Sequence, residues 1–211
     1  MPRLEIVIGT KAWSSWSLRP WLALKATGQP FKETLIELRR PDTKADILKH
    51  SPAGFVPILK HGNLTLWESL AICEYLAEAF PKAGLWPADR AARAVARCVA
   101  TEMHGGFAPL RAAMSMDVKA RHPTPAIAPA VKADIDRVTE IWRHCRRRFG
   151  AKARGARGGP FLFGRFSVAD CMYAPVTTRF TTYGVTLDPV SAAYVKAVAA
   201  WPAMKEWIAA A

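Results

Sequence analysis

FVPILKHGNLTLWESLAICEYL, residues 55–76, contains the signals that decide the fold. Two runs of strand-forming residues flank a Gly-Asn pair at 62–63, which is typical of a β-hairpin. From Glu68 onward the apolar residues recur at helical spacing as far as Phe80. The stretch therefore predicts two antiparallel strands followed directly by a helix.

The residues before this stretch predict a strand, a helix and a second strand. Residues 4–8 form a short β-branched run, and residues 31–38 loosely alternate apolar and polar side chains. Between them, Ser17 can cap a helix, and a short charged helix over residues 42–49 precedes the hairpin. The order βαβαββα predicts that residues 1–80 form a thioredoxin-like α/β domain, a small mixed sheet with helices on both faces.

The strand signal disappears after residues 81–87, which we interpret as a linker. Two long amphipathic segments follow, the first over residues 88–116. Further on, Ser167 and Asp170 form a capping-box arrangement before another helix. We therefore expect an all-α C-terminal helical domain over residues 88–211.

The composition excludes several classes of protein. With 51% hydrophobic and 22% charged residues, the chain is expected to bury a core and not to be disordered. The apolar run near the N-terminus is too short for a signal peptide, and no stretch approaches the ~18 to 20 apolar residues of a membrane span. We expect a cytoplasmic protein with no membrane partner.

The cysteines show no pattern of a redox or metal site. They stand singly among apolar neighbours, with no CxxC pair and no Cys/His cluster at metal-ligand spacing, at Cys73, Cys98, Cys145 and Cys171. We expect four buried thiols and no metal.

The net charge of +13 is concentrated in the second half of the chain. Residues 143–157 hold basic side chains and no acidic one: Arg143, Arg146, Arg147, Arg148, Lys152, Arg154 and Arg157. Such a patch can attract anionic ligands, nucleic acid or a membrane surface. It also fits a solvated helix end, where arginine is favoured by the helix dipole. We favour the helix end and expect no nucleic-acid partner.

Val56 and Pro57 stand at the start of an expected interior strand, where proline removes a hydrogen-bond donor. A cis bond between them would turn the Val56 amide and carbonyl outward, toward an extended peptide ligand. Eleven residues beyond Pro57, Glu68 and Ser69 stand where a strand gives way to a helix. A helix N-terminus with a hydroxyl suits a carboxylate, and Glu68 suits an ammonium group. Together, Glu68 and Ser69 fit an α-amino acid. Taken singly, Pro57 also fits an ordinary edge proline, Ser69 an ordinary helix cap, and Glu68 a favourable acid in the first helical turn.

These residues carry a resemblance to a known family. FVPIL followed by WESLAICEYL resembles the glutathione-site signature of cytosolic glutathione transferases, in which a cis proline and a Glu/Ser pair hold the tripeptide. FLFGRFSVADCMYAP, residues 161–175, resembles the capping-box segment of the same family's helical domain. The likeness spans nearly the whole chain. It implies glutathione as co-substrate, a helical domain that holds the second substrate, and a homodimer.

The loop SSWSLRPWL, residues 14–22, resembles the SSCxxR loop of the zeta class. That resemblance implies that Ser14 activates the glutathione thiol, and Ser15, its neighbour, stays an alternative. Lowering a thiol pKa of about 8.5 by about 1.5 units requires roughly 2 kcal/mol. One hydrogen bond to a charged group supplies ~1.5 to 3 kcal/mol, so a serine hydroxyl is sufficient.

Two positions in the expected glutathione site depart from the family pattern. Trp16 replaces the zeta-class cysteine, which weakens an assignment as a maleylacetoacetate isomerase. Phe55 stands where relatives often place Gln or Lys to reach the far end of the tripeptide. The glycine carboxylate of glutathione then needs another partner, and His50 and Lys11 are candidates.

The second-substrate pocket is expected in the helical domain. The candidate residues recur at helical spacing, with one addition from the first loop: Met103, His104, Phe107, Arg111 and Trp13. Met103 and Phe107 are more often residues of the hydrophobic core, and a histidine such as His104 is more often a polar group with an ordinary hydrogen-bond partner.

Three functions remain open from the sequence. The first is a glutathione transferase that attacks a small hydrophobic electrophile, as in detoxification. The second is a glutathione-dependent isomerase of the zeta type, and the third is a transferase-like carrier or binding protein without catalysis. The presence of Ser14, Pro57, Glu68 and Ser69 favours the first.

Overall fold

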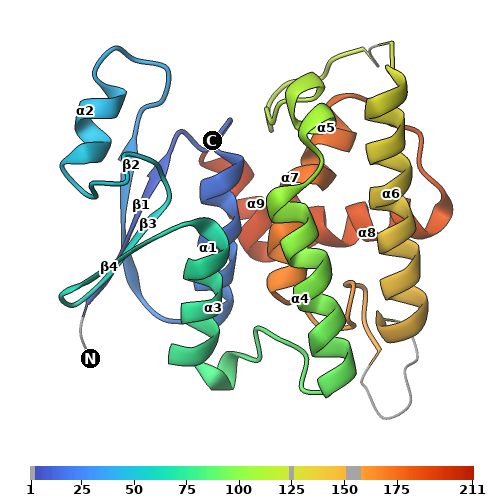
Figure 1. The fold of residues 1–211 in the computed structure, drawn as a ribbon, viewed down its shortest axis with the longest axis horizontal. Coiled ribbons are helices and arrows are strands. Elements are labelled where there is room, and N and C mark those ends of the chain that lie inside the picture. Colours follow the sequence, from blue (N-terminus) through green and yellow to red (C-terminus); the bar gives the residue numbers. More distant parts are fainter. Residues whose placement is uncertain (1–2, 124–125, 151–157) are drawn as a thin grey trace.

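The structure, a computed structural model, describes residues 3–123, 126–150 and 158–211. It has two parts, a small sheet with three helices and a larger group of helices (Figure 1). Of the basic segment 143–157, Lys152, Arg154 and Arg157 lie outside the described residues.

The N-terminal part has the predicted order βαβαββα. Its elements are β1 Leu4–Gly9, α1 Ser15–Thr27, β2 Phe31–Ile36, α2 Thr43–Leu48, β3 Ile58–His61, β4 Leu64–Trp67 and α3 Ser69–Ala79. The strand order is β2-β1-β3-β4; β1 and β2 run parallel, and the other neighbours run antiparallel. The predicted thioredoxin-like arrangement is confirmed.

Alternate residues of β1 face the two sides of the sheet, as the strand period requires. Ile6 and Ile8 join the main core with α1 and α3, whereas Val7 packs with Ile47 of α2 on the opposite side. In Figure 1, α2 lies on one side of the sheet, and α1 and α3 lie between the sheet and the C-terminal helices. The sheet is therefore covered on both faces.

The start of α1 differs from the prediction. The sequence favours Ser17 as the cap, but the helix begins at Ser15. The Ser17 hydroxyl is fully buried and accepts a hydrogen bond from the Gly9 amide at 3.1 Å. It holds the end of β1 against α1 in place of capping the helix.

The rest of the described chain consists of helices and connecting loops, with short bridges at 161–165. Its elements are η1 Pro81–Ala83, α4 Arg90–Gly105, α5 Ala108–Ala113, α6 Pro129–Cys145, η2 Arg146–Gly150, α7 Val168–Thr182, α8 Pro189–Ala200 and α9 Pro202–Ala209. The all-α prediction is confirmed. None of the helices in the described ranges is long and apolar enough to cross a membrane.

Two details of the helical part correct the sequence analysis. The expected helix over residues 88–116 is interrupted at Gly106 and Phe107, where Phe107 adopts a left-handed φ of 59°. Glycine weakens a helix by about 1 kcal/mol relative to alanine, which favours a break there. Cys98 is exposed and not buried, because it lies off the α4 face that carries Ala96 and Val99 into the core.

Helix α7 joins the two parts of the molecule. Nearly all of its side chains are buried, and it packs against both α1 and α4. Asp170 accepts the Ser167 amide at 2.9 Å, so the predicted capping contact is present at its start. The indole of Trp207 in α9 donates to the Lys11 carbonyl at 2.9 Å and makes a second link between the parts.

Candidate functional site

A cavity of about 320 Å³ lies where the loop before β3, the end of β4 and the starts of α1 and α3 meet. It brings together seven residues that the sequence singled out: Trp16, Phe55, Val56, Pro57, Glu68, Ser69 and His104. Ala53 and Trp67 complete the lining and were not predicted. Neither residue belongs to a sequence motif that would have indicated a binding site.

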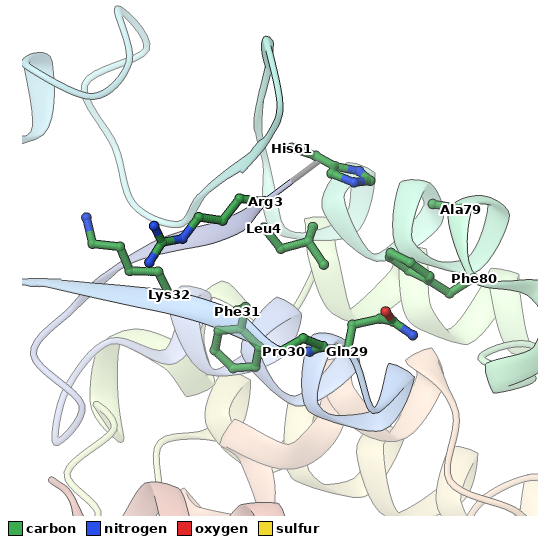
Figure 2. A pocket seen from close by; sticks show the side chains of 9 residues that line it. All are labelled: Arg3, Leu4, Gln29, Pro30, Phe31, Lys32, His61, Ala79 and Phe80. Carbon is green, nitrogen blue, oxygen red and sulfur yellow. The ribbon is translucent and has the colours of Figure 1, made fainter. Parts of the chain in front are cut away.

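A larger cavity, of about 660 Å³, lies at the opposite end of the sheet (Figure 2). Figure 2 shows Leu4, Phe31 and Phe80 around it. Two of its polar side chains are already engaged: Lys32 pairs with Glu5 at 3.2 Å, and the His61 ring bonds the Tyr75 hydroxyl at 2.6 Å. The smaller cavity holds the converging unpartnered polar groups, so we take it as the functional site.

The Val56–Pro57 peptide bond is cis, as the resemblance to glutathione transferases implied. Both residues line the cavity just before β3 begins at Ile58. Strand β3 lies between β1 and β4, so the turn is fixed at the centre of the sheet.

Glu68 and Ser69 form the start of α3. Glu68 has φ 69° and ψ 120°, a conformation that non-glycine residues rarely adopt outside functional sites. The Ser69 hydroxyl is buried and has no hydrogen-bond partner among the described residues. Buried hydroxyls normally have one. With the free amides of the first helical turn, this hydroxyl can receive a carboxylate.

His104 closes the cavity from the helical side. Its Nε2 lies 3.7 Å from Glu68 Oε2, and its Nδ1 is buried without a partner among the described residues. Burial lowers the pKa of His104, and the charges of Arg19 and Arg111 lower it further, against the opposing effect of Glu68. The ring is therefore neutral at neutral pH, with one nitrogen able to accept a hydrogen bond.

The two candidate thiol activators lie at the start of α1, beside Trp16. The Ser14 and Ser17 hydroxyl oxygens are 2.7 Å apart, and the Ser15 hydroxyl accepts from Arg179 Nη2 at 3.3 Å. Both Ser14 and Ser15 are buried, and neither is among the residues that line the cavity. The structure thus brings Val56, Pro57, Glu68 and Ser69 together around the cavity and places Ser14 and Ser15 beside Trp16 in its wall.

The predicted second-substrate residues do not form one group. Met103 and Phe107 are buried in the main core, and Trp13 donates to Asp117 at 3.3 Å beneath the Arg39 guanidinium. Arg111 remains next to the cavity, where it donates to the His104 carbonyl at 3.2 Å.

Lys44 of α2 is a residue near the cavity that sequence reasoning missed. Its ammonium lies 4.5 Å from the centre of the Phe55 ring and donates to the Gly54 carbonyl at 2.9 Å. The sequence offers Lys11 and His50 as partners for the glycine carboxylate of glutathione. Lys11 pairs with Glu33 at 2.8 Å, and His50 Nδ1 lies 3.3 Å from the Lys60 ammonium. Lys44 is the cation beside the Phe55 wall of the cavity.

Arg19 and Arg179 were also missed. Both are buried, and both lie behind Trp16 and Ser15 at the boundary between the two parts of the molecule. Arg19 belongs to the quoted SSWSLRPWL segment, but its hydrogen bond goes to the Met172 carbonyl of α7. Groups of three or more His, Cys, Asp or Glu side chains able to hold a metal ion are not found in the described ranges.

Two family models match this chain. The N-terminal domain of glutathione S-transferase matches residues 13–79, and the C-terminal domain of glutathione S-transferase matches residues 127–210. Together they account for more than two thirds of the chain. A curated relative, glutathione S-transferase 1 from Dianthus caryophyllus, is 34% identical over 99 residues, which is 46% of this chain and 45% of that protein. The match thus spans less than half the length of this relative.

Solved structures match over nearly the full length. A glutathione transferase homologue from Burkholderia GL BGR1, solved with bound glutathione, has a TM-score of 0.71 at 24% identity, covering 98% of this chain and 96% of that one. The holo structure of maleyl pyruvate isomerase, a bacterial zeta-class glutathione S-transferase, has a TM-score of 0.73 at 23% identity, covering 98% of each. At such identities these structures show a shared fold. On the two matching domain models and this fold, the chain belongs to the glutathione S-transferase family.

Proposed function

We propose that this protein is an enzyme that binds glutathione and ionises its thiol for attack on a small electrophile. The observation that carries the proposal is the buried, unpartnered Ser69 hydroxyl at the start of α3, in the cavity that also contains Val56 and Pro57. A protein interior tolerates such a hydroxyl where a ligand supplies its partner. The Burkholderia structure with bound glutathione supports the choice of ligand.

Glutathione has two carboxylates and one ammonium group, and the cavity offers a partner for each. The glutamyl carboxylate binds Ser69 and the first amides of α3, and its ammonium group binds the exposed Glu68 carboxylate. The cysteinyl backbone pairs with Val56. The glycine carboxylate lies beside Phe55, within reach of Lys44. In this scheme residues 1–80 hold glutathione, residues 81–87 link the domains and residues 88–211 contribute the second-substrate site.

The sulfur lies at the start of α1, where Ser14 or Ser15 donates to the thiolate. The positive end of this 13-residue helix adds to the stabilisation. The thiolate then attacks an electrophilic carbon: a C–S bond forms, and the leaving group departs with its electron pair. Such an activity fits detoxification in the cytoplasm.

A zeta-type isomerase is the second candidate function. It is favoured by the SSWSLR loop and by the shared fold with the zeta-class maleyl pyruvate isomerase. In that reaction the thiolate would add to a cis double bond, the bond would rotate, and the thiolate would leave unchanged. A carrier without catalysis is the third candidate.

The active form is a homodimer. Three large apolar side chains near the edge of the sheet support an interface there, since Phe55, Leu64 and Trp67 are 70%, 42% and 50% exposed. Light scattering after size-exclusion chromatography measures the mass of the particle in solution. A monomer at micromolar concentration would contradict the dimer.

Thermal unfolding with millimolar glutathione tests binding, and two substrates test the reaction. Glutathione is expected to raise the melting temperature of the wild-type protein, and Ser69→Ala to weaken its binding about tenfold. Ser69→Ala removes no hydrogen bond among the described residues, so its stability without ligand stays at the wild-type level. Turnover of an aryl halide is expected; turnover of a maleyl substrate alone favours the isomerase. No shift with glutathione favours the carrier.

A further inference from the structure

Three arginines meet behind the start of α1. Arg19 comes from α1, Arg111 from α5 and Arg179 from α7. The guanidinium carbons of Arg19 and Arg111 lie 4.0 and 5.4 Å from the centre of the Trp16 ring. Arg179 Nη2 lies 3.3 Å from the Ser15 hydroxyl oxygen. We call these three residues the arginine cluster.

Two members of the cluster, Arg19 and Arg179, are buried and short of partners, whereas Arg111 is half-buried. Arg19 is 0% exposed and Arg179 is 4% exposed. The Arg19 Nε donates to the Met172 carbonyl, but both of its Nη atoms have no partner among the described residues. The same is true of Nε and Nη1 of Arg179. In the described part of the chain, no ion pair joins any of the three to a carboxylate.

Such an arrangement is costly without an anion. Charged side chains are rarely buried unless they are paired. Burial, followed by the charges of Arg179 and Arg111, lowers the pKa of Arg19 to about 9. Burial, followed by the charge of Arg111, lowers the pKa of Arg179 to about 10. Both groups remain charged at neutral pH, so an anion placed among them relieves desolvation and mutual repulsion together.

We propose that the arginine cluster binds a carboxylate of the electrophilic substrate, so that this enzyme prefers small anionic electrophiles to neutral ones. The inference rests on the proposed glutathione chemistry. Guanidinium groups match a carboxylate in two parallel hydrogen bonds, and buried bonds of this kind are strong. The cluster adjoins Ser15 and the Trp16 wall of the cavity, so a carboxylate held there places the rest of a small substrate beside the sulfur.

The test uses two electrophiles that differ in charge, 4-chloro-3-nitrobenzoate and its methyl ester. In both, the thiolate sulfur attacks the ring carbon that carries chlorine. A C–S bond forms, the C–Cl bond breaks, chloride leaves with the electron pair, and the thiol proton passes to solvent. Each kcat/KM is divided by the uncatalysed rate of the same compound, which removes the difference in intrinsic reactivity.

The wild-type enzyme is expected to show a corrected kcat/KM for the acid on the order of 10- to 100-fold above that for the ester. This ratio corresponds to the free energy of one or two buried charge-assisted hydrogen bonds. Arg179→Met, which keeps the length of the side chain and removes its charge, is expected to reduce this preference to below about threefold. Arg90→Met removes an exposed arginine at the start of α4 and is the matched control. Equal use of acid and ester by the wild type, or an unchanged preference in Arg179→Met, overturns the proposal.

A binding measurement without glutathione separates this inference from the proposed function. Benzoate is expected to raise the melting temperature of the wild type and of Arg90→Met, and methyl benzoate is not. Arg179→Met is expected to lose the benzoate shift while its own melting temperature stays at or above that of the wild type, because a buried unpaired charge has been removed. A lower melting temperature with an intact benzoate shift would indicate a structural role and overturn the proposal.

Sulfate distinguishes a substrate carboxylate from a free inorganic anion. If sulfate shifts the melting temperature as much as benzoate does, and acid and ester are used equally, the cluster holds an inorganic anion and the proposal fails. If glutathione does not bind but the benzoate shift depends on Arg179, the proposed function fails and the carboxylate site stands.

Discussion

Arg179 Nη2 lies 3.3 Å from the hydroxyl oxygen of Ser15, although the two residues are 164 positions apart in the sequence. The contact ties the last turn of α7 to the first residue of α1. Because the Ser15 oxygen accepts this bond, its own proton remains available to a ligand. The positive charge also makes the hydroxyl a better donor, so the C-terminal helices help to set the polarity of the start of α1.

The choice between Ser14 and Ser15 can be made with single alanine variants. Removing the serine that donates to the thiolate is expected to raise the thiol pKa of bound glutathione by about 1 to 2 units. The same change should lower kcat about 10- to 100-fold. Thiolate absorbance against pH, with glutathione bound, measures the shift. Ser115→Ala removes an exposed serine and is the control. Thiol pKa values within 0.3 units of wild type in both variants, a difference of roughly 0.4 kcal/mol, would exclude both serines.

Lys44 is expected to bind the glycine end of glutathione. Lys44→Met should weaken glutathione binding about tenfold, because one charge-assisted bond is lost. It should leave the binding of γ-glutamylcysteine, which lacks the glycine, unchanged. Isothermal titration of both peptides measures the difference, with the exposed Lys49→Met as control. Equal weakening for both peptides would place Lys44 elsewhere in the site.

Asp170 is expected to be essential for stability. Its carboxylate accepts hydrogen bonds from the Leu162 amide, from the amide and hydroxyl of Ser167, and from the Tyr194 hydroxyl, all in the interior. Asp170→Ala leaves these donors without a partner, so the free energy of unfolding should fall by about 3 to 5 kcal/mol in urea titrations.

The exposed Asp136→Ala serves as control for Asp170, with an expected change within about 0.5 kcal/mol. If Asp170→Ala does not fold, Asp170→Asn, which keeps one acceptor oxygen, should show a smaller loss. A change below 1 kcal/mol in Asp170→Ala would contradict the structural role.

Asp188 should make stability depend on pH in the acid range. Burial acts to raise its pKa, but hydrogen bonds from Ser191, together with Arg143, outweigh this effect and lower the pKa to about 2. Since the unfolded value is about 3.8, the carboxylate contributes stability above pH ~4 and loses it as the pH falls toward ~2.

The unfolding free energies of wild type and Asp188→Asn, measured from pH 7 to pH 2, isolate this contribution. The difference is expected to be about 1 to 2 kcal/mol at neutral pH, allowing for solvent screening of a partly exposed group, and to vanish near pH 2. A difference that stays constant over the whole range would assign the effect to packing and not to charge.

Local patterns in the sequence determined much of the fold and the placement of Val56, Pro57, Glu68 and Ser69. The hairpin and the helix start within residues 55–76, with Glu68 and Ser69 at that start, follow from neighbouring residues, and the cis Val56–Pro57 bond was implied by the family resemblance. Periodicity and turn chemistry act over such short distances, and so they are visible in one sequence. The break at Phe107 was missed because two glycines weaken a helix without fixing where it ends.

Only the tertiary structure decided which distant side chains meet. The packing of α1 against α7 brings Arg19 and Arg179 behind Ser15, and the fold of α2 over the loop before β3 brings Lys44 beside Phe55. No periodicity or motif reports these contacts, because they depend on how whole elements pack. The sequence by itself thus determined most of the elements, the position of Val56, Pro57, Glu68 and Ser69 in them, and the family resemblance. The three-dimensional packing determined which charged side chains surround the start of α1.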